Sequence, residues 1–246
     1  MGFDERIVAV IQARVGSSRL PSKVLRALGV RPVLEWVVRA AQAAKLVDEV
    51  VIATSVAPGD DAIEALGRSL AVSVIRGSED DVLSRFLLAA DAADASAIVR
   101  LTADCPLLDP TLIDQVVNLW RSDRRLDYVS TTLARSLPRG LDVELATVTA
   151  LQRASQLPTG HHRVHVTSAF YQPDSGFELG GIVYRPDSSR FRVTLDTAAD
   201  AEVLDAIVAV LGDRLIPWRE VTAFLESNPD VVSLNSFVVQ KALDEG

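Results

Sequence analysis

Short apolar runs alternate with longer amphipathic segments along the first half of the chain. The runs are rich in Val, Ile and Ala, which is typical of buried strands, and the longer segments keep apolar residues on one side, which is typical of helices. This alternation predicts a mainly parallel sheet covered by helices. The expected strands are residues 6–12, 49–54, 72–75 and 97–101. The expected helices are residues 32–45, 59–70 and 110–120, and one that Ser78-x-x-Asp81 caps and that runs to about residue 91.

The second half of the chain is less regular. Expected strands are residues 127–132, residues 141–145 at the sheet edge, and residues 190–195. Expected helices are residues 148–156, 199–211 and 218–226, with a break at 158–160. Since repeats and long linkers are absent from the sequence, we predict one domain over residues 1–246, elaborated at about 127–190.

A loop suited to phosphate follows the first expected strand. It holds one glycine, Gly16, and carries Ser17 and the cations Arg14, Arg19 and Lys23. Ligands of open α/β sheets bind outside the carboxyl ends of the strands, and free N–H groups with several cations suit a polyphosphate there. The loop has neither common glycine-rich phosphate signature. A solvated basic turn is the alternative interpretation.

Charge and composition limit the partners. The net charge is −8, yet residues 1–45 hold eight Lys/Arg against three Asp/Glu. An acidic body with a local basic segment argues against nucleic-acid binding and favours a small anionic ligand. No apolar run is long enough for a membrane span. One cysteine in the sequence excludes an internal disulfide and favours the cytoplasm.

Two aspartates follow expected strands at the same edge of the sheet. Asp104 lies three residues beyond the strand at 97–101, and Asp196 directly follows the strand at 190–195. Two carboxylates together with substrate phosphates suit Mg²⁺. Each has a structural alternative, since Asp104 could cap a turn before Pro106 and Asp196 could cap the next helix. Asp109 before Pro110 is expected to be a helix cap.

Other polar groups cluster after residue 140. Asp142 and Glu144 alternate and would share one face of a strand, where they could bind hydroxyl groups or perform acid–base chemistry, or simply be solvated. His161 and His165, with His162 between them, have a spacing that can bind zinc on a helix. A third ligand is not evident, so a ligand-contacting or hydrogen-bonded role is favoured.

Seven segments together resemble cytidylyltransferases of the acylneuraminate and 3-deoxy-manno-octulosonate type, with the spore coat polysaccharide branch as the nearest likeness. Most specific are Ile-Gln-Ala-Arg-Val-Gly-Ser-Ser-Arg-Leu-Pro-Ser-Lys at 11–23 and the segments at 76–86 and 100–109. The others are residues 127–130, 140–144, 165–167 and 195–197.

The resemblance implies a three-layer Rossmann-like sandwich of the nucleotide-diphospho-sugar transferase type, and transfer of a cytidylyl group from CTP to a sugar-like acceptor with Mg²⁺. It implies catalytic roles for Arg14, Lys23 and Asp104, and metal binding by Asp104 and Asp196. The implied nucleotide-binding residues are Ala13, Arg14, Gly16, Ser17, Arg19, Lys23, Arg76, Asp81 and Asp104. We expect Asp142, Glu144 and His165 at the acceptor.

The sequence departs from the family pattern at two informative places. Ala103 replaces the usual glycine before Asp104, and Val164 replaces a glutamate before His165. These departures leave open a catalytically silent nucleotide-binding homologue, and a glycosyltransferase that consumes a nucleotide sugar is a further alternative. Relatives commonly dimerise, and the apolar stretch 231–239 would pack against a second copy or form a buried strand.

Overall fold

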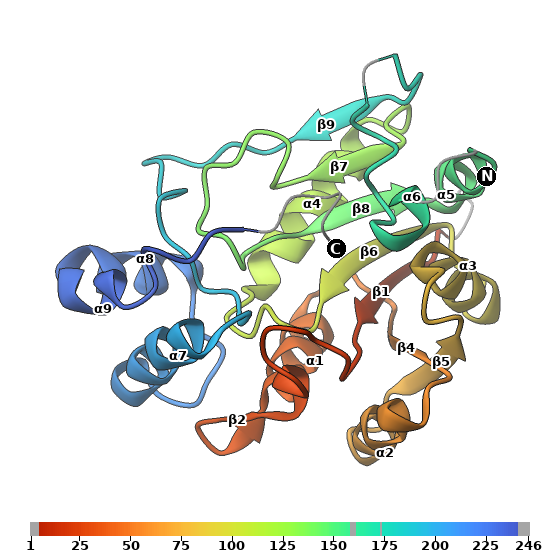
Figure 1. Ribbon diagram of the computed structural model, residues 1–246. Helices are drawn as coiled ribbons and strands as arrows, with labels where there is room; N and C mark the ends of the chain where they lie inside the picture. The colour runs from red at the N-terminus through yellow and green to blue at the C-terminus, as the bar shows by residue number, and fades with distance from the viewer. Residues whose placement is uncertain (1–4, 158–160, 173, 241–246) are drawn as a thin grey trace.

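A seven-stranded sheet forms the centre of the computed structural model, which describes residues 5–157, 161–172 and 174–240 (Figure 1). The β6–β8 and β8–β7 pairs are antiparallel and the others are parallel, so β8 alone runs against the other six strands of this sheet in the described chain. In spatial order the strands are β5 (Ser73–Gly77), β4 (Glu49–Ser55), β1 (Ile7–Gln12), β6 (Ala97–Thr102), β8 (Glu144–Thr147), β7 (Tyr128–Ser130) and β9 (Leu179–Gly181).

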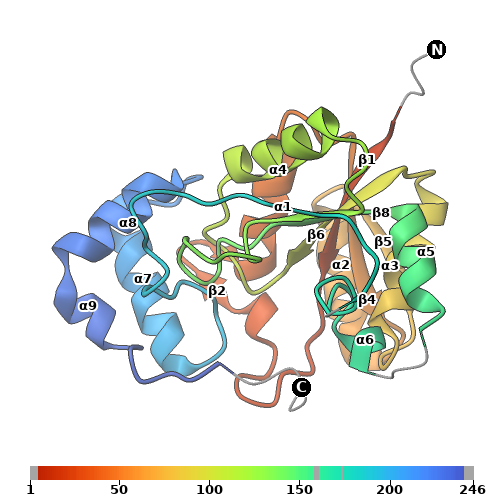
Figure 2. The ribbon, with the colours of Figure 1, turned by 90° about the horizontal axis from the view of Figure 1, so that it is seen from above.

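Helices cover both faces of the sheet, as Figure 2 shows from above. One face packs against α1 (Val33–Ala43), α2 (Asp61–Ser69) and α4 (Pro110–Ser122). The other packs against α3 (Val82–Ala92) and α5 (Val148–Ser155). The predicted three-layer α/β architecture is therefore confirmed.

Three further helices extend the molecule beyond α1 (Figures 1 and 2). They are α7 (Ala198–Leu211), α8 (Trp218–Ser227) and the short α9 (Pro229–Ser233). Apolar residues of α7 and α8 join the same core as α1 and α4. None of the helices in the described chain is long and apolar enough to cross a membrane.

The sequence of strand β1 is an almost unbroken apolar run because both faces of the strand are buried. Ile7, Ala9 and Ile11 enter the core on the α1 side, whereas Val8 and Val10 enter the core on the α3 side. All five are fully buried, which is what a central parallel strand with two covered faces requires. Polar residues begin only at the half-buried end of the strand, Gln12, and continue in the loop that follows.

The register brings the ends of three strands, β1, β4 and β6, to one edge of the sheet. Gln12, the last residue of β1, pairs with Ala53 of β4 and with Thr102 of β6. The loops that leave β1 and β6 therefore begin side by side, which places the basic loop next to Asp104.

Two expected strands take other forms. Residues 141–145 are not an edge strand, because β8 lies between β6 and β7 and pairs with both. Residues 190–195 form a single bridge to Arg139 instead of a strand. The backbone hydrogen bonds of this segment go to loops. Val193 N donates to Arg139 O at 2.7 Å and Leu195 N donates to Asp104 O at 2.8 Å, so the segment does not form a continuous ladder with a strand.

Several short elements were not predicted. Residues 231–239 include the end of α9 and turns, not a strand. Helix α3 takes Asp81 as its N-cap, because this side chain accepts from Ser84 N at 2.9 Å; Ser78 instead accepts from Asp81 N. The expected break at 158–160 lies outside the described residues. The other unpredicted elements are β2 (Ala27–Leu28), β3 (Arg31–Pro32), α6 (His161–Val164) and the 3-10 turns Lys23–Leu25 and Pro58–Asp60.

Candidate active site

The loop after β1 is held in a fixed curve by backbone bonds and by one buried carboxylate. Ser17 N and Ser22 N both donate to Val15 O, at 2.8 and 2.9 Å. Val15 N donates to Asp60 Oδ1 at 2.8 Å, and Asp60 also accepts from the hydroxyl of Ser55 at 2.6 Å. Burial alone raises the pKa of Asp60, but these donors lower it below its ordinary value, so Asp60 is an ionised anchor for the loop.

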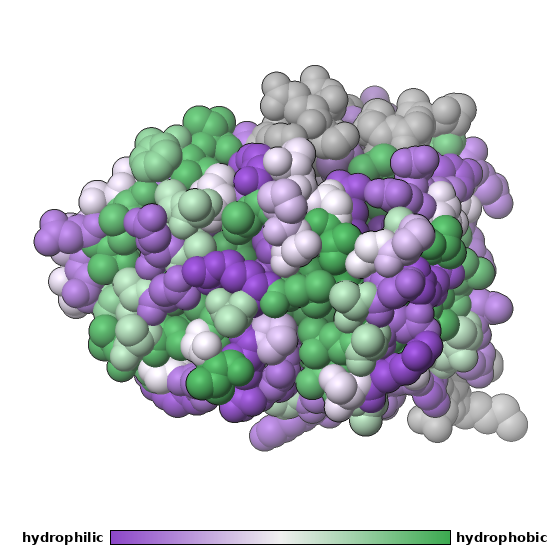
Figure 3. Space-filling model, turned by 60° about the horizontal axis from the view of Figure 1, so that its bottom comes forward, coloured by the Kyte–Doolittle hydropathy of each residue, from purple (hydrophilic) through white to green (hydrophobic). Residues whose placement is uncertain are grey.

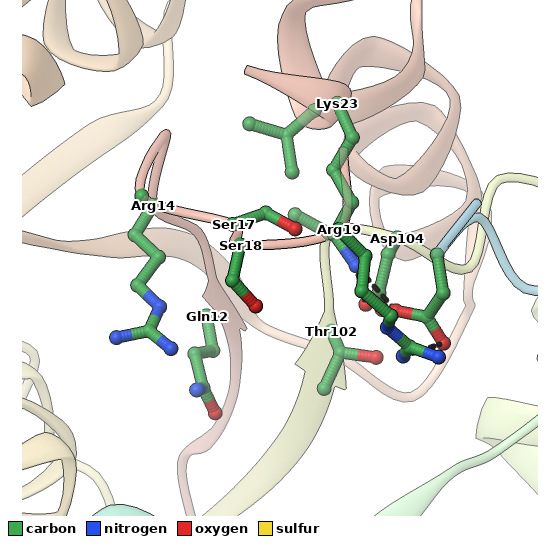
Figure 4. Close-up of a pocket in the computed structure, with 12 residues that line it drawn as sticks. Gln12, Arg14, Ser17, Ser18, Arg19, Lys23, Thr102 and Asp104 are labelled. Carbon is green, nitrogen blue, oxygen red and sulfur yellow. Dashed lines mark hydrogen bonds and ion pairs between the residues drawn. The ribbon is translucent and has the colours of Figure 1, made fainter. Parts of the chain in front are cut away.

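A cavity of about 410 Å³ opens between this loop and the end of β6 (Figure 4). Figure 4 shows Arg19, Lys23 and Asp104 gathered on one side of it and Arg14 on the other. Ala13, which was expected among the nucleotide residues, is buried beneath the loop and donates its N–H to Ala53 O. The lining residues are Gln12, Arg14, Gly16, Ser17, Ser18, Arg19, Lys23, Val24, Thr102, Ala103, Asp104 and Asp196.

Lys23 joins the two predicted metal ligands. Its Nζ lies 2.6 Å from Asp104 Oδ2 and 2.7 Å from Asp196 Oδ1, and its side chain is only 11% exposed. Burial alone lowers the pKa of Lys23, but the two carboxylates outweigh it and raise that pKa above its ordinary value. Two aspartates that are 92 positions apart in the sequence thus converge on one cationic atom.

Two arginines also hold Asp196 in place, Arg19 in the cavity lining and Arg192 outside it. Arg19 lies 3.1 Å from Asp196 Oδ2, and Arg192 donates to the same oxygen at 2.5 Å. Arg192 reaches back to Asp200 at 2.8 Å, and Asp200 forms a capping box with Thr197 at the start of α7. The helix cap is therefore Thr197, and the carboxylate of Asp196 stays directed to the cavity.

A second, smaller cavity of about 170 Å³ adjoins the first and shares Thr102 with it. All three predicted acceptor residues, Asp142, Glu144 and His165, line this cavity. The remaining lining residues are Arg100, Thr102, Thr132, Arg135, Thr167 and Tyr171.

Glu144 is the buried centre of a charged network. It pairs with Arg100 and accepts from the hydroxyls of Tyr128 and Thr167, the latter at 2.8 Å. Burial raises the pKa of Glu144, but Arg100 and the two hydroxyls outweigh that effect and lower it below its ordinary value. Glu144 is thus an ionised carboxylate that holds Arg100 in place.

Two arginines that sequence reasoning missed shape the same region. Arg135 forms a fork with Asp142, at 2.6 and 3.0 Å. Arg100 donates to Gln12 Oε1 at 3.1 Å, which connects the smaller cavity to the larger one. Arg100 lies inside the motif at 100–109, but its direction into this network depends on the antiparallel pairing of β6 with β8, which the sequence did not predict.

Arg76 and Asp81 lie outside the linings of both cavities. Arg76 is 2.7 Å from both Asp61 and Glu64 and donates to the backbone carbonyls of Ser55 and Ala57, at and just after the end of β4. Asp81 caps α3 and pairs with Arg163 of α6 at 2.7 Å. Both order segments near the loop, and their expected contact with nucleotide stays a prediction.

The histidines and the cysteine do not form a metal or nucleophile centre in the described chain. His162 bonds Ser168 through Nδ1 at 2.7 Å, and the side chain of His161 lies outside the described residues. No group of three or more His, Cys, Asp or Glu residues suited to a metal occurs among the described residues. Burial, and then Asp104, raise the pKa of Cys105 well above its ordinary value, so it stays a thiol.

The fold and this edge define a class of protein. A mainly parallel α/β sheet carries a cationic loop and converging aspartates at its carboxyl edge, where proteins of this architecture bind ligands such as nucleotides. Comparison with known proteins narrows the class. Residues 8–166 match the family model for cytidylyltransferases.

Similar proteins support this match over nearly the whole chain. Protein MJ1063 of Methanocaldococcus jannaschii is 35% identical over 98% of both chains. The spore coat polysaccharide biosynthesis protein SpsF of Bacillus subtilis is 34% identical over 92% of this chain and 97% of that one. A cytidylyltransferase from Leptospira borgpetersenii superposes with a TM-score of 0.89 at 28% identity, covering 97% of this chain and all of that one. The chain belongs to the cytidylyltransferase family and is a nucleotidyltransferase.

Proposed function

We propose that the chain is a Mg²⁺-dependent enzyme that transfers the cytidylyl group of CTP to a sugar-like acceptor and releases pyrophosphate. The observation that carries this proposal is the convergence of Lys23, Asp104 and Asp196 in the cavity that the basic loop encloses. Family membership supports the nucleotide, and the geometry supports the role of each side chain.

The basic loop is suited to the triphosphate. Arg14, Arg19 and Lys23 line one cavity with the hydroxyls of Ser17 and Ser18. Guanidinium groups bind phosphate oxygens through two parallel hydrogen bonds, and an ammonium group follows them as a mobile point charge. We therefore assign the β- and γ-phosphates, which leave as pyrophosphate, to this loop.

The carboxylates fit a magnesium ion. Oxygens of Asp104 and Asp196 both lie within 2.7 Å of one cationic atom, so a single cation between them would contact both. Mg²⁺ takes oxygen ligands and is commonly bound through one or two carboxylates plus substrate phosphates and water. The chemistry that Mg²⁺ supplies is polarisation of phosphate oxygens and neutralisation of developing charge.

Catalysis then rests mainly on position and charge. An oxygen of the acceptor attacks the α-phosphorus, and the bond to the pyrophosphate oxygen breaks. Arg14, Arg19 and Lys23 hold the departing group, since phosphoryl-group transfer depends on alignment and electrostatic stabilisation rather than covalent help from the protein.

The smaller cavity is the proposed acceptor site. Asp142, Glu144 and His165 line it together with threonine hydroxyls, and these groups suit a hydroxyl-rich molecule. The segment at about 127–190 supplies most of this side within a single domain. Similarity to a protein of spore coat polysaccharide biosynthesis supports a role in making surface polysaccharide.

A pyrophosphate-release screen tests the proposal. Four nucleoside triphosphates are crossed with acidic, neutral and phosphorylated sugars as acceptors in the presence of Mg²⁺. We expect release with CTP and one class of acceptor. Turnover of a nucleotide sugar that yields a nucleoside diphosphate would instead show a glycosyltransferase, and binding of CTP without turnover across the panel would show a silent homologue.

Asp104→Asn tests the metal assignment. The substitution removes one charge at the proposed Mg²⁺ site with little change in shape, so Mg²⁺-dependent release of pyrophosphate from CTP should fall by about 100-fold or more, the scale seen when one electrostatic catalytic group is lost. The exposed Asp91→Asn on α3 is the matched control and should retain the wild-type rate. Undiminished release by Asp104→Asn refutes its role.

A further inference from the structure

The ammonium group of Lys23 stands where the proposed metal site requires a divalent cation. It contacts one oxygen of Asp104 at 2.6 Å and one of Asp196 at 2.7 Å, and the side chains of Lys23 and Asp196 are 11% and 13% exposed. A cation placed between the same two oxygens would lie against the ammonium group. The two cations are therefore alternatives at this point.

We propose that Lys23 makes metal binding conditional on the nucleotide. Without a triphosphate, its ammonium group neutralises Asp104 and Asp196 and excludes a divalent cation from them. A bound triphosphate draws the ammonium group to its phosphate oxygens and frees both carboxylates for the metal. The inference rests on the proposed function and adds to it an order of assembly and the residue that enforces it.

The charge balance around the site supports this exclusion. Lys23, Arg19 and Arg192 all contact Asp196. The nearby carboxylates are those of Asp104, Asp196 and Asp200, so three cations face three anions. Such a neutral cluster has no surplus negative charge to attract a divalent cation. A triphosphate brings the missing negative charge into the same cavity.

The position of Lys23 allows the exchange. It begins a short 3-10 turn, Lys23–Leu25, next to Val24, which is buried in the core, so the backbone is anchored while the four-carbon side chain can swing. The basic loop and Lys23 line one cavity, so the ammonium group need not leave it to reach phosphate. After the exchange the ammonium group is paired with phosphate and the two carboxylates are paired with the metal. The exchange therefore avoids the cost of leaving a buried charge without a partner.

The test measures Mn²⁺ binding by the electron paramagnetic resonance signal of the free ion, with and without CTP, and the signal that CTP removes in the absence of protein is subtracted. We expect the wild type to bind Mn²⁺ weakly alone and much more tightly with CTP. Lys23→Met should bind Mn²⁺ without CTP about tenfold more tightly than the wild type, because the competing cation is gone. Lys23→Arg keeps the charge and should keep the exclusion, and the exposed Lys45→Met should match the wild type.

The outcomes separate this inference from the proposed function. If wild type and Lys23→Met bind Mn²⁺ equally well without CTP, the inference is wrong. The proposed metal site is still supported in that case if Asp104→Asn loses the Mn²⁺ binding that CTP promotes. If Asp104→Asn binds Mn²⁺ as the wild type does under both conditions, the metal site itself is wrong. Should Lys23→Met fail to fold, wild-type binding of Mn²⁺ that is equally tight with and without CTP would overturn the inference by itself.

Discussion

Single charged residues determine how both cavities are built. Asp60 anchors the basic loop, Lys23 joins the aspartates, and Glu144 orders Arg100 between the two cavities. Each is enclosed, so each charge needs a partner of opposite sign or several hydrogen bonds. Sequence motifs identified Lys23 and Glu144, whereas Asp60 lies at the start of the helix expected at 59–70, and its role is visible only from its contact with Val15.

Glu144→Gln should destabilise the fold and leave Arg100 without its charge partner. Loss of one member of a buried ion pair costs about 3–5 kcal/mol in the free energy of unfolding. Chemical denaturation at pH 7 measures this change. The exposed Glu226→Gln is the matched control and should change stability by less than about 0.5 kcal/mol. Equal stability of Glu144→Gln and the wild type would show that the network is not structural.

The loss of folding stability at acidic pH should also depend on Glu144. The pKa of Glu144 is lower in the folded protein than its ordinary value of 4.5, so its contribution is present above that value and is lost as pH falls through the folded pKa. Between about pH 5 and 3 the wild type should lose more stability than Glu144→Gln. Parallel curves of unfolding free energy against pH would contradict this assignment.

At the scale of elements, the sequence predicted the parallel half of the sheet better than the rest. Strand β1 and its parallel neighbours are continuous apolar runs, because both faces are covered. Strand β8 carries the buried Glu144, and β9 includes Gly180 and Gly181, so neither has a strong strand pattern. Residues 190–195 have the apolar pattern of a strand, but they do not pair in the sheet. Their apolar residues Val193 and Leu195 are buried.

The residues of the candidate site were likewise predicted in part from the sequence. The basic loop and Asp104 come shortly after β1 and β6, and Asp196 follows residues 190–195, which were expected to be a strand, so the edge rule predicted that these residues lie together. Partners that lie far away in the sequence, such as Arg19 on Asp196 and Arg100 on Glu144, depend on how distant segments pack. Spacing along the chain carries no signal for such contacts.

Asp109 links two helices and should matter for stability alone. It caps α4 by accepting from Thr111 N at 2.8 Å, as predicted, and it also accepts from Trp218 N at the start of α8 at 2.9 Å. Asp109→Ala leaves both N–H groups unpaired and should cost about 2 kcal/mol. Thermal unfolding should shift down by roughly 4–8 °C while KM for CTP is unchanged. A changed KM with an unchanged melting temperature would contradict this role, and Asp230→Ala at the exposed start of α9 is the control.

On the scale of the whole molecule, charge is concentrated where the chemistry is proposed. The protein carries a net charge of −8, and its basic loop lines one cavity together with two aspartates. Figure 3 shows polar and apolar residues interspersed over the face that it displays. The attraction for a triphosphate therefore depends on a few local cations and, in the proposed function, on the Mg²⁺ that Asp104 and Asp196 would hold.

Calorimetric titration of CTP into wild type and Asp196→Asn, once with Mg²⁺ and once with EDTA, tests this account most directly. With Mg²⁺ the variant should bind CTP more weakly, because a metal ligand is lost. In EDTA it should bind CTP at least as tightly as the wild type, because a carboxylate that repels phosphate and holds Lys23 is gone. The same change in affinity under both conditions would contradict a metal held between Asp104, Asp196 and the triphosphate.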